Sequence, residues 1–149
     1  MSDIKKRLQT DMKDALKAKD KARLGVIRLI LAAIKQKEVD ERVEVTDDDM
    51  LVLLDKQVKQ RRESIAQFEK AGREDLKEQE VYEHGVILTY LPEQLSDEEI
   101  EQHIDQAVTE SAATSMKDMG KIMAILKPIF QGRVDMSVAT KYIKAKLSS

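Results

Sequence analysis

The sequence lacks cysteine altogether and is poor in aromatic residues, proline and glycine. Without cysteine, the chain forms no disulfide, has no thiolate nucleophile and offers no cysteine ligand to zinc. Aromatic residues make up only 3% of the 149 residues, and there are two prolines and five glycines. Because aromatic residues favour strands, whereas proline and glycine interrupt helices, this composition predicts an all-α protein.

Long uninterrupted hydrophobic runs are also missing. The most apolar stretch, residues 23–37, reads RLGVIRLILAAIKQK and is broken by Arg28 and Lys35. A membrane-spanning helix needs about 20 apolar residues, so this stretch instead predicts the central helix of a bundle, covered by its neighbours. Arg28 and Lys35 lie two helical turns apart and share one face. That face is either part of a basic site or a solvent-exposed edge, and the length of these side chains favours the edge.

Charge is unevenly distributed along the chain, although the net charge is only −2. Residues 93–113 contain seven acidic residues and no Lys or Arg, whereas residues 114–149 contain seven basic residues against two acidic ones. A locally basic segment can bind phosphate groups even in an acidic protein. A solvated helix face has the same composition, so charge alone does not distinguish the two.

Helix start and stop signals predict seven helices. Asp20 is expected to cap the second helix, Thr46 with Asp49 the third, and Ser115 with Asp118 the sixth, and Gly72 is expected to end the third. Pro92 stops the fourth helix, and Ser96 with Glu99 three residues later forms a capping box that starts the fifth. Further on, Pro128 is expected to end or kink the sixth helix, and Gly132 to stop it. The predicted architecture is an N-terminal four-helix bundle in residues 1–92, followed by a small three-helix domain in residues 93–149.

Motifs of self-contained enzymes are not found in the sequence. It contains no GxxxxGK[ST], GxGxxG, HExxH or GxSxG pattern. His84 and His103 each stand alone, without a partner at ligand spacing, and are expected to be surface or structural residues. The three aspartates at 47–49 lack the alternating spacing of a calcium loop. The sequence therefore predicts no catalytic residue, no metal site and no cofactor.

One group of residues in the C-terminal domain has the chemistry of a phosphate-binding surface. Gly120 lies in the first turn of a predicted helix, where a position without a side chain permits close approach to the backbone. Helix N-termini flanked by cations favour phosphate oxygens. The candidate RNA-binding residues are Lys117, Gly120, Lys121, Lys127, Gly132, Arg133, Lys141 and Lys144. In the alternative interpretation, Gly120 permits two helices to cross and the lysines are merely solvated.

Several stretches of the chain resemble the GatB/YqeY family. The clearest is DMGKIMAILKPIFQGRVD, residues 118–135, which is similar to the tail of that family. Residues 19–38, 57–76 and 90–100 are similar to further family segments, in the same order and at the same spacing. The resemblance covers nearly the whole chain. It is closer to the free-standing, YqeY-type member than to the amidotransferase B subunit.

The resemblance implies an all-α protein whose C-terminal part is similar to the tail of the amidotransferase B subunit. That tail helps hold tRNA while mischarged Glu-tRNA or Asp-tRNA is amidated. The best matches to its motif are Gly120, Lys121, Gly132 and Arg133, and Lys127 and Lys141 match less well. Val134 and Met136 depart from the pattern, which commonly has a small residue and a glycine there. A backbone contact in this turn is therefore less well supported.

Three functional hypotheses follow from the resemblance and the residues. The first is a tRNA-binding or tRNA-enzyme accessory protein, whose partner is tRNA or an aminoacyl-tRNA-handling enzyme. The second is a protein–protein adaptor that docks through the N-terminal bundle without RNA. The third is a component with carbon–nitrogen ligase activity and glutamine as amido-N-donor, an activity that family membership implies but no residue here supports. The opening MSDIKKRLQTDM has no signal or transit character, which predicts a cytoplasmic protein without membrane contact.

Overall fold

A computed structural model of the chain describes residues 2–148, which form seven α-helices, one short 3-10 helix and no β-strand. The predicted all-α class is therefore confirmed. The chain divides into two compact units, Met1–Leu91 and Pro92–Ser149. None of the helices in residues 2–148 combines the length and the hydrophobicity needed to cross a bilayer.

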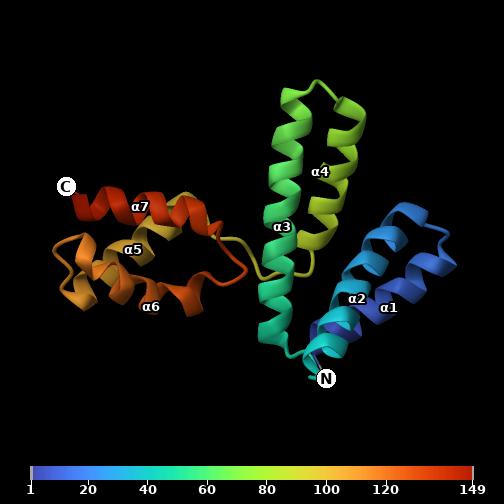
Figure 1. Ribbon diagram of the computed structural model, residues 1–149, viewed down its shortest axis with the longest axis horizontal. Helices are drawn as coiled ribbons and strands as arrows, with labels where there is room; N and C mark the ends of the chain where they lie inside the picture. The colour runs from blue at the N-terminus through green and yellow to red at the C-terminus, as the bar shows by residue number, and fades with distance from the viewer. Residues whose placement is uncertain (1, 149) are drawn as a thin grey trace. The chain divides into compact units, whose positions relative to one another are not determined.

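The N-terminal unit consists of two helical hairpins (Figure 1). The first contains α1 (Asp3–Lys17) and α2 (Lys21–Glu41), and the second contains α3 (Asp47–Lys70) and α4 (Glu74–Leu88). α1 also packs against α3, and α2 packs against both α3 and α4. One continuous apolar core therefore joins the two hairpins. Its fully buried members include Leu8, Ile27, Ile30, Met50 and Leu54.

The helix ends of this unit follow the signals in the sequence. The carboxylate of Asp20 accepts a hydrogen bond from the backbone N–H of Arg23 at 3.2 Å and caps α2. Thr46 and Asp49 form the predicted capping box at the start of α3. Gly72, just beyond α3, has a φ of +69°, as expected for a glycine that ends a helix.

The central helix, α2, is less covered than its sequence predicts. Ile27 and Ile30 are buried, but the side chain of Leu29 is 59% exposed. Arg28 and Lys35 are both exposed, so their shared face lies at the surface, as both interpretations of it require. The prediction that neighbours cover this helix on nearly all sides is therefore wrong. Although α1, α3 and α4 all pack against α2, one side of the helix, with Leu29, Ala32 and Lys35, stays exposed.

The C-terminal unit contains α5 (Asp97–Ser111), η1 (Met116–Asp118), α6 (Met119–Phe130) and α7 (Met136–Ser148). α5 packs against both α6 and α7, and the 3-10 helix η1 lies against the same two helices. Phe130 is fully buried at the centre of this unit's core. The ring of His103 meets the ring of Phe130 edge-on, with 6.0 Å between centroids. His103 therefore has a packing role.

Two boundaries in this unit differ from the prediction in detail. Ser115 and Asp118 do form a capping box, but it starts the three-residue η1, and α6 follows directly after η1 at Met119. Pro128 lies inside α6, which continues to Phe130. The missing N–H of Pro128 removes one helical hydrogen bond. The helix nevertheless continues because Phe130 at its end is anchored in the core.

Candidate functional site

The predicted RNA-binding residues lie on three helices and one turn of the C-terminal unit. Six of them are exposed, namely Lys117 on η1, Gly120, Lys121 and Lys127 on α6, and Lys141 and Lys144 on α7. The other two, Gly132 and Arg133, form the turn between α6 and α7 and are buried and half-buried, respectively. The eight residues thus separate into exposed helix faces and a packed turn.

The exposed face of α6 is open at its first turn. Gly120 is exposed, and a Cβ atom built on it would meet no other atom within 4 Å. No neighbouring helix therefore requires a glycine here, which rules out helix crossing as the reason for Gly120. Lys127 lies seven residues further on, and so shares this face. The side chain of Lys121 is 69% exposed.

An acidic residue moderates the charge at this helix start. The carboxylate of Asp118 accepts hydrogen bonds from the backbone N–H groups of Thr114 and Ser115, at 3.0 and 3.3 Å. These hydrogen bonds, followed by the nearby charge of Lys121, hold the pKa of Asp118 below its usual range. Asp118 is therefore ionised at neutral pH, 3.8 Å from the ammonium group of Lys121. Such an exposed pair contributes little energy and leaves Lys121 available to a ligand.

The turn between α6 and α7 holds the chain segment that precedes α5. The Nε of Arg133 donates to the carbonyl oxygen of Glu93, and the backbone N–H of Leu95 donates to the carbonyl oxygen of Arg133, both at 3.0 Å. The side-chain amide of Gln94 donates to the carbonyl oxygen of Gly132 at 2.7 Å. Gly132 has a φ of +74°, a backbone conformation that favours glycine. Both turn residues therefore have a structural role in this unit.

The exposed lysines of α7 belong to a different helix surface from those of α6. Lys141 and Lys144 lie three residues apart and share a face. Lys146 forms a 2.9 Å ion pair with Asp105 of α5. A cavity of about 320 Å³ between α5 and α7 is lined by Glu101, Asp105 and Lys146, among others, but by neither Lys141 nor Lys144. Lys141 and Lys144 thus lie on an exposed helix face and do not line this cavity.

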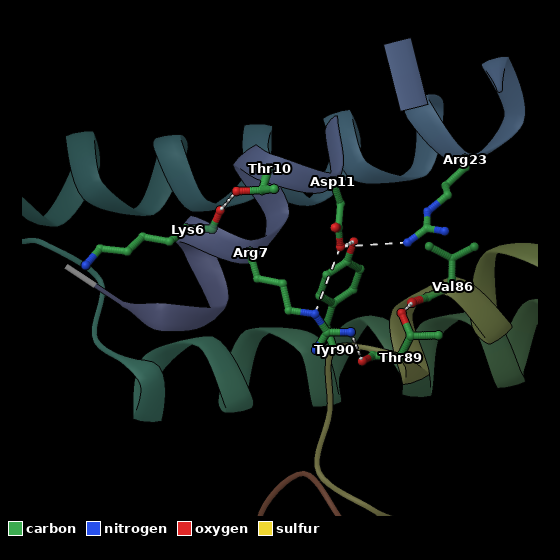
Figure 2. A network of polar contacts seen from close by, with 8 residues as sticks. All are labelled: Lys6, Arg7, Thr10, Asp11, Arg23, Val86, Thr89 and Tyr90. Carbon is green, nitrogen blue, oxygen red and sulfur yellow. Dashed lines mark hydrogen bonds and ion pairs between the residues drawn. The ribbon is translucent and has the colours of Figure 1, made fainter. Parts of the chain in front are cut away.

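A second polar cluster, in the N-terminal unit, centres on Tyr90 (Figure 2). The buried hydroxyl of Tyr90 donates a hydrogen bond to the carboxylate of Asp11 at 2.5 Å. The guanidinium of Arg7 lies 4.7 Å from the centre of the Tyr90 ring and donates to the carbonyl oxygen of Thr89 at 2.8 Å. Arg23 of α2 lies 3.7 Å from the same carboxylate of Asp11. The cluster therefore fastens the chain after α4 to both α1 and α2.

The electrostatics of this cluster indicate a structural hydroxyl. Burial, followed by the hydrogen bond to Asp11, raises the pKa of Tyr90 to about 12. The hydroxyl therefore stays protonated at neutral pH and continues to donate. Sequence reasoning missed this cluster because Asp11 and Tyr90 lie 79 residues apart. The only local signal is the Tyr-Leu-Pro sequence at the end of the unit.

A third group of charged residues links α3 to α4. Arg61 pairs with Glu80 at 3.1 Å and with Glu83 at 2.8 Å. Burial raises the pKa of Glu80, while the charge of Arg61 opposes this rise. Burial, and then the charge of Arg62, lowers the pKa of His84, so that its imidazole is neutral at pH 7. Within residues 2–148, no group of three or more His, Cys, Asp or Glu side chains is arranged to hold a metal ion.

Comparison with known proteins gives relatives along nearly the entire chain. A family model described as Yqey-like protein matches residues 5–147. "Altered inheritance of mitochondria protein 41, mitochondrial" of Pyrenophora tritici-repentis is 31% identical over 143 residues, covering 95% of this chain and 77% of that protein. The protein of the same name from Kluyveromyces lactis is 36% identical over 144 residues, covering 93% and 72%. That of Vanderwaltozyma polyspora is 32% identical over 149 residues, covering 95% and 74%.

These relatives overturn one prediction and confirm another. The predicted cytoplasmic localisation is wrong on this comparison, because the three relatives are named as mitochondrial proteins. That prediction rested on the first twelve residues, and the relatives extend beyond the region that this chain matches. Family membership was predicted from the motifs and is confirmed by the match to residues 5–147. The chain belongs to the YqeY-like protein family.

Proposed function

We propose that the protein is a tRNA-binding or tRNA-enzyme accessory protein that contacts the RNA backbone through one face of α6. This surface, the α6 face, consists of Gly120, Lys121 and Lys127 of α6 together with Lys117 of the adjoining η1. Gly120 is the observation that carries the proposal. It is exposed, and a side chain there would meet no atom within 4 Å, so packing gives no reason for a glycine. Close approach of a phosphate to the first turn of α6 does give one.

The chemistry of the α6 face suits an RNA backbone better than bases. Its lysines act as mobile point charges for phosphate oxygens. Stacking on bases needs exposed aromatic rings. The aromatic residues in the described part of this unit are Phe130, which is fully buried, and Tyr142, which is half-buried. Recognition is therefore mainly electrostatic and dependent on RNA shape.

The remaining candidate residues have supporting roles in this proposal. Gly132 and Arg133 shape the turn that ends α6, and Lys141 and Lys144 add contacts from α7. The N-terminal helices, as the predicted four-helix bundle, serve as a scaffold. The resemblance of residues 118–135 to the tail of the amidotransferase B subunit supports tRNA as the RNA class. Because three relatives are named as mitochondrial, mitochondrial tRNA is an appropriate ligand alongside bulk tRNA.

A second candidate function, that of a protein–protein adaptor, is favoured by the apolar side chains that the N-terminal unit exposes. Leu29 of α2 is 59% exposed and Val39 is 65% exposed. Exposed apolar surface often marks a protein interaction site. In this alternative, a protein partner binds the N-terminal unit and no RNA is bound.

The proposal is tested by fluorescence anisotropy of labelled tRNA across a salt series. We expect wild-type affinity to fall as salt rises, and Lys121→Glu/Lys127→Glu to bind at least about tenfold more weakly with a smaller salt slope. Lys56→Glu/Lys59→Glu reverses the same number of exposed charges on α3 and is the matched control, which should bind as wild type does. Gly120→Leu should weaken binding, whereas Gly85→Leu, at another exposed helical glycine, should not.

Two outcomes contradict the proposal. One is equal weakening in the α6 and α3 variants, which would mean that only total charge matters. The other is no binding by the wild-type protein at low salt, after which salt-insensitive capture of a protein partner would support the adaptor. If glutamine-dependent amidation in a reconstituted mixture stops when this chain is omitted, the ligase hypothesis is favoured instead.

A further inference from the structure

The α1–α2 hairpin contains a cavity that the RNA proposal does not use. Its volume is about 500 Å³, and its lining includes Leu16, Lys19, Lys21, Leu24, Gly25 and Arg28. This volume lies within the range of protein ligand pockets, about 300–1,000 Å³. Leu16 is 48% exposed here, although it belongs to the apolar stripe of α1. The cavity thus combines an apolar floor with a cationic rim.

Gly25 borders this cavity on the exposed side of α2, in the second turn of the helix. A glycine inside a helix is less favourable than alanine by about 0.5–1 kcal/mol. A Cβ atom on Gly25 would nevertheless meet no other atom within 4 Å. Packing within the chain therefore does not require glycine at this position. Gly25 lines this cavity and also a second one, of about 380 Å³, on the side of Tyr82 and Glu83.

The cations at the rim form no ion pair with the described part of the chain. Among residues 2–148, none of the ion pairs involves the side chain of Lys19, Lys21 or Arg28. Lys21 and Arg28 lie seven residues apart, and Lys35 follows after seven more, so the three share one exposed stripe. Successive cations along this stripe are about 10.5 Å apart.

We propose that this surface binds an acidic amphipathic helix of a partner protein. The surface, called the hairpin groove, consists of the cavity and the stripe formed by Lys21, Gly25, Arg28, Ala32 and Lys35. A helix that runs alongside α2 has the same rise per residue, so carboxylates at every seventh position meet the three cations in register. An apolar side chain between the carboxylates enters the cavity over Gly25. Ala32 is exposed and small, so it permits the same close approach one heptad further on.

The composition of the hairpin groove disfavours other ligands. An RNA backbone would use only the cations of the groove and would leave its apolar floor unfilled. A small molecule is usually enclosed on most sides, whereas this cavity is bounded by two adjacent helices and their loop. A lipid surface needs more inserted apolar area than Leu16 alone provides. Charge complementarity together with an apolar pocket therefore indicates a helical protein segment.

The test uses a synthetic helical peptide, about three heptads long, with glutamate and leucine recurring on one face. A matched peptide carries lysine in place of each of those glutamates. We expect the glutamate peptide, but not the lysine peptide, to bind the full-length protein in calorimetry. Lys21→Glu/Arg28→Glu should weaken this binding at least about tenfold. Gly25→Leu fills the cavity and should weaken it as well.

The controls separate this groove from general charge and fold effects. Lys56→Glu/Lys59→Glu and Gly85→Leu make the same kinds of change outside the groove and should bind the peptide as wild type does. Circular dichroism verifies that each variant keeps its helices. Failure of the glutamate peptide to bind, or equal binding by all variants, overturns the proposal. It is also overturned if the peptide does not bind, while phosphatidylserine-containing vesicles or tRNA bind the wild-type protein and bind Lys21→Glu/Arg28→Glu more weakly.

Discussion

The two units differ in the side chains that they leave exposed. Seven of the eight large hydrophobic side chains that are exposed among residues 2–148 lie in the N-terminal unit, namely Leu16, Leu29, Val39, Val43, Val52, Val81 and Tyr82. The C-terminal unit exposes only Met116 of this set, together with the lysines of α6 and α7. The C-terminal unit thus covers its own core and offers charge, whereas the N-terminal unit retains apolar surface suited to a protein partner.

The units also hold the chain on either side of Pro92 by different chemistry. The N-terminal unit holds Tyr90 through charged side chains, including Asp11 and Arg7. The C-terminal unit holds residues 93–95 mainly through backbone carbonyl groups of the α6–α7 turn. A tyrosine hydroxyl titrates, whereas a backbone carbonyl does not. The two attachments are therefore expected to respond differently to pH.

The largest expected effect comes from Phe130→Ala, which tests whether the units have separate cores. Phe130 is fully buried, so the change should lower the free energy of unfolding by about 3–5 kcal/mol. Hydrogen exchange should show the loss of protection in α5–α7 and not in α1–α4. Leu54→Ala, in the core of the N-terminal unit, should give the reverse pattern. Loss of protection in both units by either variant would mean that they unfold together.

Tyr90→Phe tests the attachment of Tyr90 through its hydrogen bond to Asp11. The change should lower the free energy of unfolding by about 1.5–3 kcal/mol near neutral pH, which is the value of a hydrogen bond to a charged group. In the unfolded chain Tyr90 ionises near its ordinary pKa of 10.0, whereas in the folded protein its pKa is about 12. Between these values only the unfolded state loses the proton, so stability falls as pH rises. In urea unfolding, the difference in free energy of unfolding between the wild type and Tyr90→Phe should therefore shrink from pH 10 to pH 12. A constant difference over that interval would contradict the role of the buried hydroxyl.

Changes in the backbone attachment should have smaller effects. Arg133→Ala removes the donor to Glu93, and Gln94→Ala removes the donor to the buried Gly132 carbonyl. Each should lower the stability of the C-terminal unit by about 1 kcal/mol at any pH between 6 and 9. Lys127→Ala on the exposed face of α6 is the control and should change stability by less than about 0.5 kcal/mol. If Arg133→Ala weakens tRNA binding without loss of stability, the residue contacts RNA directly.

The smallest effect should be a gain in stability from Gly25→Ala. The position is helical and exposed, and a Cβ meets no atom within 4 Å, so alanine should stabilise the N-terminal unit by up to about 1 kcal/mol. A rise in the denaturation midpoint without a change in m-value would verify this expectation. A fall would show that Gly25 has a conformational role, and would weaken the case for a binding surface.

Local features of the fold were predictable because they depend on residues close in sequence. The caps at Asp20, Thr46 and Ser96 are formed as predicted, since a cap satisfies backbone groups within one turn. The exposure of Arg28 also followed from a local feature, since a long cationic side chain extends from an apolar helix to solvent. The exposure of Leu29 did not, because it depends on where other helices pack, and its sequence context is uniformly apolar.

The candidate site was predictable only in part, for the same physical reason. Helical spacing placed Lys121 and Lys127 on α6, and both are exposed. It did not reveal that Arg133 contacts Glu93, because that contact joins segments 40 residues apart. The cluster around Tyr90 was missed for the same reason. Contacts between distant segments need the tertiary arrangement, which no local pattern specifies.

The hydrogen bonds that hold residues 93–95 determine where the chain can be divided. Ser96 caps α5 and would be an obvious first residue for a separate C-terminal fragment. A fragment that began there would lose Gln94 and leave the Gly132 carbonyl without that donor. Division between Leu91 and Pro92 keeps every one of these bonds within a single fragment. Each half can then be tested alone, the first against acidic peptides and the second against tRNA.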